Sequence, residues 1–505
     1  MSQEAAAPRP PGRGGLRFGT RIIAGPITPH RERLAHSAHE LGAWVILALT
    51  LLVIALSPTL SPVPWFKALY DQKRAAELAV IVVSLVVFVA RPTACRAIPK
   101  AAGFGVLALA ALGAVSALVS ASPRHAVMEV ALFAGLFILT LNLASSFRKC
   151  AHRALLLTWY MLALGTLLLL VEFLAGCAGA LVQGRALSAH EIVPGFSNIR
   201  FLNQVQTWTI PLLALGLCAL PRLPGPLVAT GYFVLGGSWM ILLATGARGS
   251  VLSLILASAL SALAFGRRAR SFAKIQLLGA TGGILAYLLV FQLAPLLAGI
   301  NESLVPELGR TVDSGRLALW KLASTLVAEN PLLGVGPQHF AWYTNPFSLA
   351  HPHNAALQIA SEWGLPAILI VAWLALWGFL KWTTSVNSWA PGLPQAGQRV
   401  ALWVSLVAGA SHSLLTGILV MPLSQLLLAL VCGALMGTCR PRKAGAPAAT
   451  LRSSMPTRLL ATLALVALVA SVAPDLLIRL SGEEPSPQGM EVLGPRFWQL
   501  GGIPH

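Results

Sequence analysis

The sequence predicts an all-α fold, that of a polytopic helical membrane protein with about thirteen transmembrane helices and a long helical loop on one side. Hydrophobic residues make up 56% of the 505 residues, charged residues make up only 10%, and the mean hydropathy is +0.74. A soluble domain carries about 25% charged residues, so this chain lacks the polar surface that a water-soluble protein needs. Apolar runs of about 20 residues, the length that crosses a bilayer, recur along nearly the whole chain.

The apolar runs assign thirteen spans when hydropathy is the criterion. They cover residues 41–58, 76–90, 101–120, 126–146, 154–175, 207–220, 227–246, 250–265, 275–297, 355–380, 400–418, 421–438 and 459–478. The chain then divides into a disordered basic tail (1–40), helices one to nine (41–297), a long loop (298–354), helices ten to twelve (355–438), a basic loop (439–458), helix thirteen (459–480) and a final tail (481–505). The final tail carries Trp498, a residue type that suits the membrane interface.

The basic residues predict which side of the membrane each loop faces. The net charge is +19, from 36 Lys and Arg against 17 Asp and Glu. In a soluble protein this excess would suggest nucleic acid, but in a membrane protein it marks cytoplasmic loops. With a cytoplasmic N-terminus and alternating spans, 24 of the 36 basic residues fall inside, including the clusters at 267–270 and 440–443. We therefore expect membrane lipids as surroundings and no nucleic-acid partner.

The long loop at 298–354 contains a predicted helix. Four apolar residues share one face at helical spacing, namely Leu319, Leu322, Ala323 and Leu326. Asp313 or Ser314 can cap the first turn, and Asn330-Pro331 ends the helix because proline disfavours a helical residue before it. The pattern is typical of a short helix that lies in the plane of the membrane surface.

Two histidines close the same loop. His351 and His353 flank Pro352 immediately before the tenth apolar run, so we expect His353 at or near a helix N-terminus. The positive end of the helix dipole there lowers the imidazole pKa. A neutral imidazole is what a general base near pH 7 requires.

A polar stripe follows the histidines. Asn354, Gln358 and Glu362 are spaced four residues apart, so they share one helical face at the outer end of an otherwise apolar span. Polar groups in a membrane are costly and usually face a cavity or a partner. A structural alternative is that Glu362 only joins hydrogen bonds between helices.

Arginines mark two further sites on the same side. Arg248 lies in the tight turn Gly-Ala-Arg-Gly at 246–249, at the outer membrane boundary, and Arg200 precedes Asn203 in a second long loop, from about 177 to 206. A guanidinium suits a phosphate because its fixed fork of donors matches the oxygens. An arginine at a boundary can equally reach towards lipid headgroups.

Three pieces of the chain together resemble the O-antigen ligase and polymerase superfamily of bacterial envelope glycosyltransferases. They are the turn at 246–249, the segment Ser-Gly-Arg-Leu-Ala-Leu-Trp at 314–320 leading into 329–336, and His-Pro-His-Asn at 351–354. The resemblance covers roughly residues 200–420. Ligases of this family continue with nine residues, glycine, two residues, then Gly, Thr or Tyr. This chain has Gly364 but Ala367 at the last position.

The resemblance implies a glycan donor on undecaprenyl pyrophosphate and transfer to an acceptor hydroxyl, that of lipid A-core or another glycan, at the periplasmic face of the inner membrane. It implies inversion, and neither a metal nor another cofactor. Arg248 and Arg316 match the two essential arginines of the family and His353 matches its essential histidine. The loop at 298–354 is then a periplasmic catalytic loop, with Arg200, Asn203, Asp313, His351, Asn354, Gln358 and Glu362 as supporting residues.

Several activities share this apparatus. A ligase moves a finished polysaccharide to lipid A-core, a polymerase extends a lipid-linked chain, and a protein O-oligosaccharyltransferase modifies Ser or Thr. The sequence favours the first two, with ligase slightly ahead. A transporter is the alternative from another class, but transporters place charges near the membrane midplane. Here the notable charges gather at the outer surface, and His412, inside the eleventh predicted span, is the main exception, where a hydrogen bond between helices explains it.

Overall fold

The computed structural model describes residues 30–61, 63, 66–90, 100–193, 195–219, 223–300, 315–343, 347–439, 455–481 and 493–503. Within these ranges every regular element is a helix, so the predicted all-α fold is confirmed. Eight helical stretches are long and apolar enough to cross a bilayer, which confirms a multi-pass membrane protein. The count of thirteen spans stays a prediction.

The eight stretches are α3 (Lys100–Val119), α4 (Pro123–Lys149), α5 (Ala151–Val182), α9 (Gly225–Ala244), α10 (Arg248–Phe265) with η1 (Gly266–Arg268), α11 (Arg270–Leu288) with η2 (Leu289–Leu293) and α12 (Ala294–Leu297), α15 (Leu365–Asn387) and α18 (Met455–Leu480). The other helices are α1 (His30–Leu56), α2 (Leu69–Ala90), α6 (Ala189–Ile192), α7 (Ile199–Leu212), α8 (Ala214–Leu217), α13 (Arg316–Glu329), η3 (His339–Trp342), α14 (Ala355–Trp363), α16 (Pro394–Ser413) and α17 (Pro422–Thr438).

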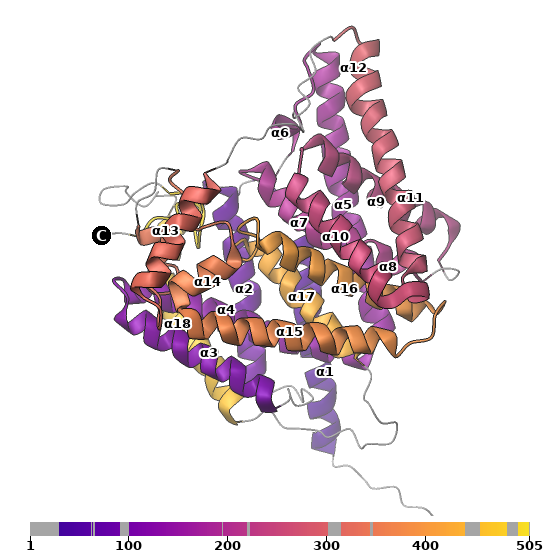
Figure 1. The fold of residues 1–505 in the computed structure, drawn as a ribbon. Helices are drawn as coiled ribbons and strands as arrows, with labels where there is room; N and C mark the ends of the chain where they lie inside the picture. The colour runs from indigo at the N-terminus through magenta and orange to yellow at the C-terminus, as the bar shows by residue number, and fades with distance from the viewer. Residues whose placement is uncertain are drawn as a thin grey trace, which may run out of the picture.

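Helix α4 is the centre of one half of the bundle, where it packs against α2, α3, α17 and α18. In the other half α9 packs against α11, and α16 packs against α7 and α10 (Figure 1). Glycines allow the close approach, because a Cβ at Gly437 of α17 would lie 2.5 Å from the carbonyl oxygen of Ala144 on α4. Small residues at helix contacts are typical of proteins that pack in lipid.

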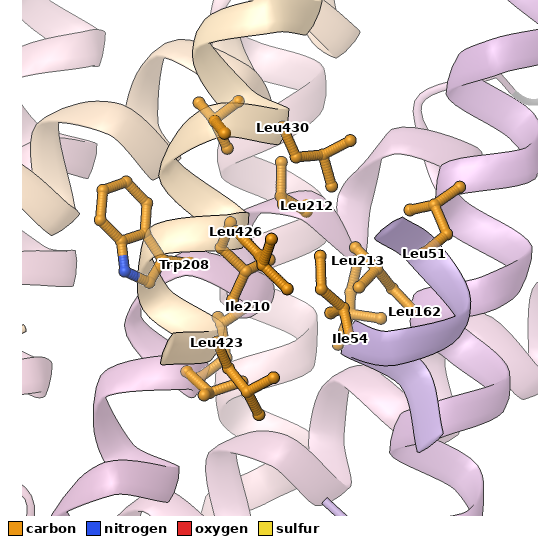
Figure 2. Packing of buried hydrophobic residues seen from close by; sticks show 14 of the residues in the cluster. Leu51, Ile54, Leu162, Trp208, Ile210, Leu212, Leu213, Leu423, Leu426 and Leu430 are labelled. Carbon is orange, nitrogen blue, oxygen red and sulfur yellow. The ribbon is translucent and has the colours of Figure 1, made fainter. Parts of the chain in front are cut away.

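Buried apolar side chains fill the space between α1, α5, α7 and α17 (Figure 2). The labelled side chains are Leu51, Ile54, Leu162, Trp208, Ile210, Leu212, Leu213, Leu423, Leu426 and Leu430. Trp208 also covers Gly409 of α16, where a Cβ would lie 2.2 Å from the indole ring. The start of α7, which carries Arg200 and Asn203, is thereby held to the core.

The predicted tenth span, 355–380, is wrong as one continuous helix. It is two helices, α14 and α15, which meet at Gly364. Gly364 has φ 86° and ψ 168°, and a Cβ there would lie 2.2 Å from the carbonyl oxygen of Leu332. Only glycine adopts this backbone conformation readily, so the chain turns where the hydropathy pattern runs on.

The second long loop is also shorter than predicted. Helix α5 continues to Val182, and α7 begins at Ile199 with the side chain of Asn198 accepting a hydrogen bond from the backbone N–H of Arg200 at 2.9 Å. Arg200 and Asn203 therefore lie on a helix, not in the loop at 177–206. An asparagine cap of this kind satisfies one of the unpaired N–H groups of a first turn.

The predicted helix in the loop at 298–354 is confirmed as α13, which ends before Asn330. Leu319, Ala323 and Leu326 are buried on the predicted face, and Leu322 is partly buried beside them. Asp313 and Ser314 lie outside the described residues. The N-cap position is held by Gly315, which has φ 74° and provides no side-chain cap.

Candidate functional site

The turn at 246–249 is fastened to the first turns of α7. Arg200 donates from Nη1 to the carbonyl oxygen of Gly246 at 3.3 Å, and Asn203 donates from Nδ2 to Thr245 Oγ1 at 2.8 Å. Ser250 Oγ in turn donates to the carbonyl oxygen of Asn203 at 3.1 Å. These bonds place Arg248, the exposed first residue of α10, next to the exposed Arg200.

Helix α16 closes this corner through His412. The Nδ1 atom of His412 lies 2.9 Å from Thr207 Oγ1 of α7, which is the interhelical hydrogen bond that the sequence predicts. A Cβ at Gly249 would lie 3.1 Å from Nε2 of the same ring. The glycine after Arg248 is therefore needed so that the turn can sit against His412.

Helix α13 holds Arg316 close to the segment that carries the two histidines. Its buried face packs on Phe340, and Trp320 donates from Nε1 to the carbonyl oxygen of Pro352 at 3.1 Å. At its start Gly315 lies against the Phe347 ring, where a Cβ would be 2.5 Å away. The first turn of the helix, with Arg316, is thus fixed to the segment that contains His353.

Three arginines lie within electrostatic range of one another at this place. The pKa of Arg200 is lowered by burial and by the positive charges of Arg248 and Arg316. Arg316 also acts on His353 and lies within electrostatic range of His412. The structure therefore gathers the arginines of three separate segments, α7, α10 and α13, around one histidine-bearing corner, where their field favours an anion.

His353 lies directly before the N-cap of α14, as the sequence predicts. Asn354 caps the helix by accepting the backbone N–H of Leu357 at 3.1 Å. His353 has φ 54°, a backbone conformation that is uncommon for residues other than glycine and often marks a functional site. Burial, and then the charge of Arg316, lowers its pKa to about 4, so the ring is neutral near pH 7. The predicted cause was the helix dipole, whereas burial is the larger effect.

His351 packs against His353 and accepts its backbone N–H. Its ring centre lies 4.2 Å from that of His353, and its Nδ1 accepts the backbone N–H of His353 at 3.3 Å. His351 is buried against Gly417, and its pKa lies well below the usual value because of burial and the charges of His353 and Arg496. A neutral His351 can accept that backbone hydrogen bond.

The polar stripe on α14 has a partner that the sequence did not reveal. Glu362 Oε2 accepts from Arg496 Nη2 at 2.6 Å, and Glu362 Oε1 accepts the backbone N–H of Phe340 at 3.1 Å. Burial raises the pKa of Glu362, although the charge of Arg496 opposes this shift. Arg496 belongs to the final tail, which the sequence placed at the membrane interface. The hydropathy pattern carries no signal for this long-range contact.

One comparison identifies the family. Residues 232–372 match the family model described as O-Antigen ligase. This range includes Arg248, Arg316 and the segment at 351–354, and it excludes Arg200 and Arg496. No curated protein matches the chain. The match covers residues 232–372, which contain three of the clustered segments, and it supports membership of the O-antigen ligase and polymerase superfamily.

Proposed function

We propose that the protein is a ligase-type membrane glycosyltransferase, which moves a glycan from undecaprenyl pyrophosphate to a hydroxyl of lipid A-core on the periplasmic face of the inner membrane. The observation that carries the proposal is the gathering of Arg200, Arg248 and Arg316 around a neutral His353. A lipid pyrophosphate needs cationic groups that stabilise its negative charge, and an acceptor hydroxyl needs a neutral base that takes its proton.

The proposed reaction is a single displacement. His353 removes the proton of the acceptor hydroxyl, whose oxygen attacks the anomeric carbon of the donor sugar from the face opposite the pyrophosphate. The bond between that carbon and the pyrophosphate oxygen breaks, so the configuration inverts. The lipid pyrophosphate leaves with the bonding electrons, and its growing negative charge is stabilised by Arg248 and Arg316. Because the guanidiniums supply this stabilisation, we propose that the transfer needs no metal.

An apolar cavity offers a way in for the lipid carrier. It has a volume of about 290 Å³ and lies between α3, α4, α14 and α15, with Phe133, Phe137 and Trp363 among its lining residues. Ala355 and Gln358, close to the start of α14, also line it. A lipid chain in this cavity would have its polar end near His353, so the carrier could enter sideways from the bilayer.

The orientation in the membrane follows from the basic loops. The clustered site lies at the ends of α9, α16 and α18 and at the starts of α4, α10 and α14, away from the basic segment 267–270 between α10 and α11. Since basic loops stay in the cytoplasm, we propose a cytoplasmic N-terminus and a periplasmic site.

The alternative is a polymerase of O-antigen or exopolysaccharide in the same superfamily. Ala367, buried in α15, stands where ligases carry Gly, Thr or Tyr. Under this alternative the acceptor is the terminal sugar of another lipid-linked glycan, and the arginines and His353 keep their roles. A protein O-oligosaccharyltransferase or a transporter is a weaker alternative.

The test compares wild type with His353→Ala in a strain that lacks the native gene. Surface polysaccharide and lipid-linked glycan are separated by size on one gel. We expect the variant to lose roughly 10²-fold or more of the product per protein molecule, the range for a general base. His152→Ala, an exposed histidine at the start of α5, is the matched control.

The accumulated species separates the two activities. Long lipid-linked polymer without attachment to core indicates a ligase, and single lipid-linked repeat units indicate a polymerase. If His353→Ala accumulates in the membrane and matches wild type in both fractions, the proposed function is wrong.

A further inference from the structure

The final tail folds back into the molecule and packs on the loop that carries the histidines. Leu493 and Ile503 of the tail form one buried cluster with Ala341 and Ala350 of the loop. Gly494 donates its backbone N–H to the carbonyl oxygen of Ser348 at 2.8 Å. A surface tail would not bury its apolar side chains in this way, so this segment is part of the packed structure.

Helix α2 holds the tail from the other side. Tyr70 Oη donates to the carbonyl oxygen of Arg496 at 2.6 Å, and Arg74 Nε donates to that of Phe497 at 2.8 Å. Asp71 accepts the backbone N–H of Gln499 at 2.5 Å. Three side chains on the first turns of α2 thus fix the backbone from Arg496 to Gln499.

The guanidinium of Arg496 joins α14 to α4. It is 1% exposed and donates from Nη2 to Glu362 of α14 at 2.6 Å and to Glu129 of α4 at 2.8 Å. With its amide oxygen turned towards the guanidinium, Gln358 accepts from Nη2 at 2.8 Å and also from Nη1. Two of the three residues of the polar stripe on α14 therefore bind a single side chain.

We infer that Arg496 is a positioning residue, which fixes α14 through Gln358 and Glu362 and thereby holds His353 in its working place. Gln358 and Glu362 lie four and eight residues after the N-cap Asn354, so the contact covers about 6 Å of the helix and ends about 12 Å from its cap. Arg496 also acts electrostatically on His351, whose ring accepts the backbone N–H of His353. This inference rests on the proposed function.

Removal of the cation has two separable effects. A buried carboxylate without its partner is strongly destabilising, because it keeps its desolvation cost. Loss of the Arg496 guanidinium also frees α14 to shift. A misplacement of about 1 Å can lower the rate roughly 10²-fold. A variant that also neutralises both carboxylates, Glu129 and Glu362, removes the first effect and leaves the second.

The test measures product per protein molecule and thermal stability in detergent for Arg496→Met, Arg496→Lys, Arg399→Met and the triple variant Arg496→Met/Glu129→Gln/Glu362→Gln. Arg399 is a buried arginine of α16 that donates to the carbonyl oxygens of Gln395 and Thr438, about 20 Å along the helix from His412. Its loss controls for the removal of a buried cation.

We expect Arg496→Met to lose roughly ten- to hundred-fold in product per molecule. Arg496→Lys should retain more product, because an ammonium can still pair with Glu362. The triple variant should regain stability and yet stay roughly ten-fold below wild type. Arg399→Met should lose stability and keep wild-type product per molecule.

The inference is overturned if the triple variant is stable and gives wild-type product, because Arg496 would then only compensate buried charges. If Arg496→Met does not accumulate, the triple variant decides by the same criterion. Failure of the proposed function is distinguishable, since His353→Ala would then also keep its product.

Discussion

Two groups of arginines at the same end of the bundle differ in their surroundings. Arg200 and Arg248 are exposed and Arg316 is half-buried, whereas Arg496 is 1% exposed and paired with two buried glutamates. A cation already neutralised by carboxylates has little field left for an incoming anion, while exposed guanidiniums close together attract one. Under the proposed function, burial and pairing with carboxylates, not residue type, separate the arginines that bind the donor from the arginine that positions α14.

The largest expected effect is on the first group of arginines, which includes Arg316. Arg316→Ala should lower product per molecule by roughly 10²- to 10³-fold, the usual loss when one stabilising donor of a transition state is removed. Thermal stability should stay at the wild-type value, in contrast to Arg496→Met. Arg316→Lys should be intermediate, because an ammonium keeps the charge without the fork.

Lys321→Ala provides the control for that experiment, since Lys321 is an exposed cation on the same helix, α13. The same gel assay measures all three variants. If Arg316→Ala behaves like Lys321→Ala, the exposed arginines do not bind the donor and the comparison fails.

A smaller effect, on stability, is expected at the corner between α14 and α15. Gly364→Ala puts a Cβ 2.2 Å from the carbonyl oxygen of Leu332, at a φ of 86°. The backbone conformation alone costs about 1–3 kcal/mol, so the melting temperature in detergent should fall. Gly282→Ala is the matched control, because nothing lies within 4 Å of a Cβ there. Equal melting temperatures for both variants would show that the corner tolerates a side chain.

The smallest effects concern the pH dependence of folding stability, to which His353 and Glu362 should contribute in opposite directions. The unfolded pKa of histidine is about 6.5 and that of His353 in the fold is about 4, so the unfolded state takes up the proton first and stability falls as pH drops below 6.5. The unfolded pKa of a glutamate is about 4.3 and burial raises the pKa of Glu362 in the fold, so stability falls as pH rises above this unfolded value.

Melting temperatures at several pH values check this pattern. His353→Asn should flatten the acid side, since asparagine tolerates a positive φ, and Glu362→Gln should flatten the alkaline side. The transfer rate should change little between pH 7.5 and 5.5, whereas a base with a pKa of 6.5 would lose about ten-fold. A ten-fold loss over that range would contradict a buried, neutral His353.

Local signals predicted the local structure well. The apolar face and the Asn330-Pro331 stop define α13, and the cap residue Asn354 defines the start of α14. The corner at Gly364 was missed because an isolated glycine in an apolar run does not interrupt hydropathy. Its conformation is imposed by the loop, where Leu365 donates its backbone N–H to the carbonyl oxygen of Pro331 at 2.8 Å.

The long-range part of the site could not be predicted. The polar stripe on α14 indicated that a partner exists, but Arg496 is 134 residues from Glu362 and 367 residues from Glu129. No periodicity links positions so far apart. The arginines at 200, 248 and 316 were found because each stands in a short motif, and only the packing of α7, α10 and α13 places them together.

The position of Arg496 in the chain also has a consequence for biogenesis. At a synthesis rate of about 5–20 residues per second, roughly 20 to 70 s pass between the synthesis of Glu129 and that of Arg496. During that interval the carboxyl group of α4 must stay protonated or in contact with water, because its cation does not yet exist. The contact of Arg496 with α4 and α14 therefore forms only after α18 has been made.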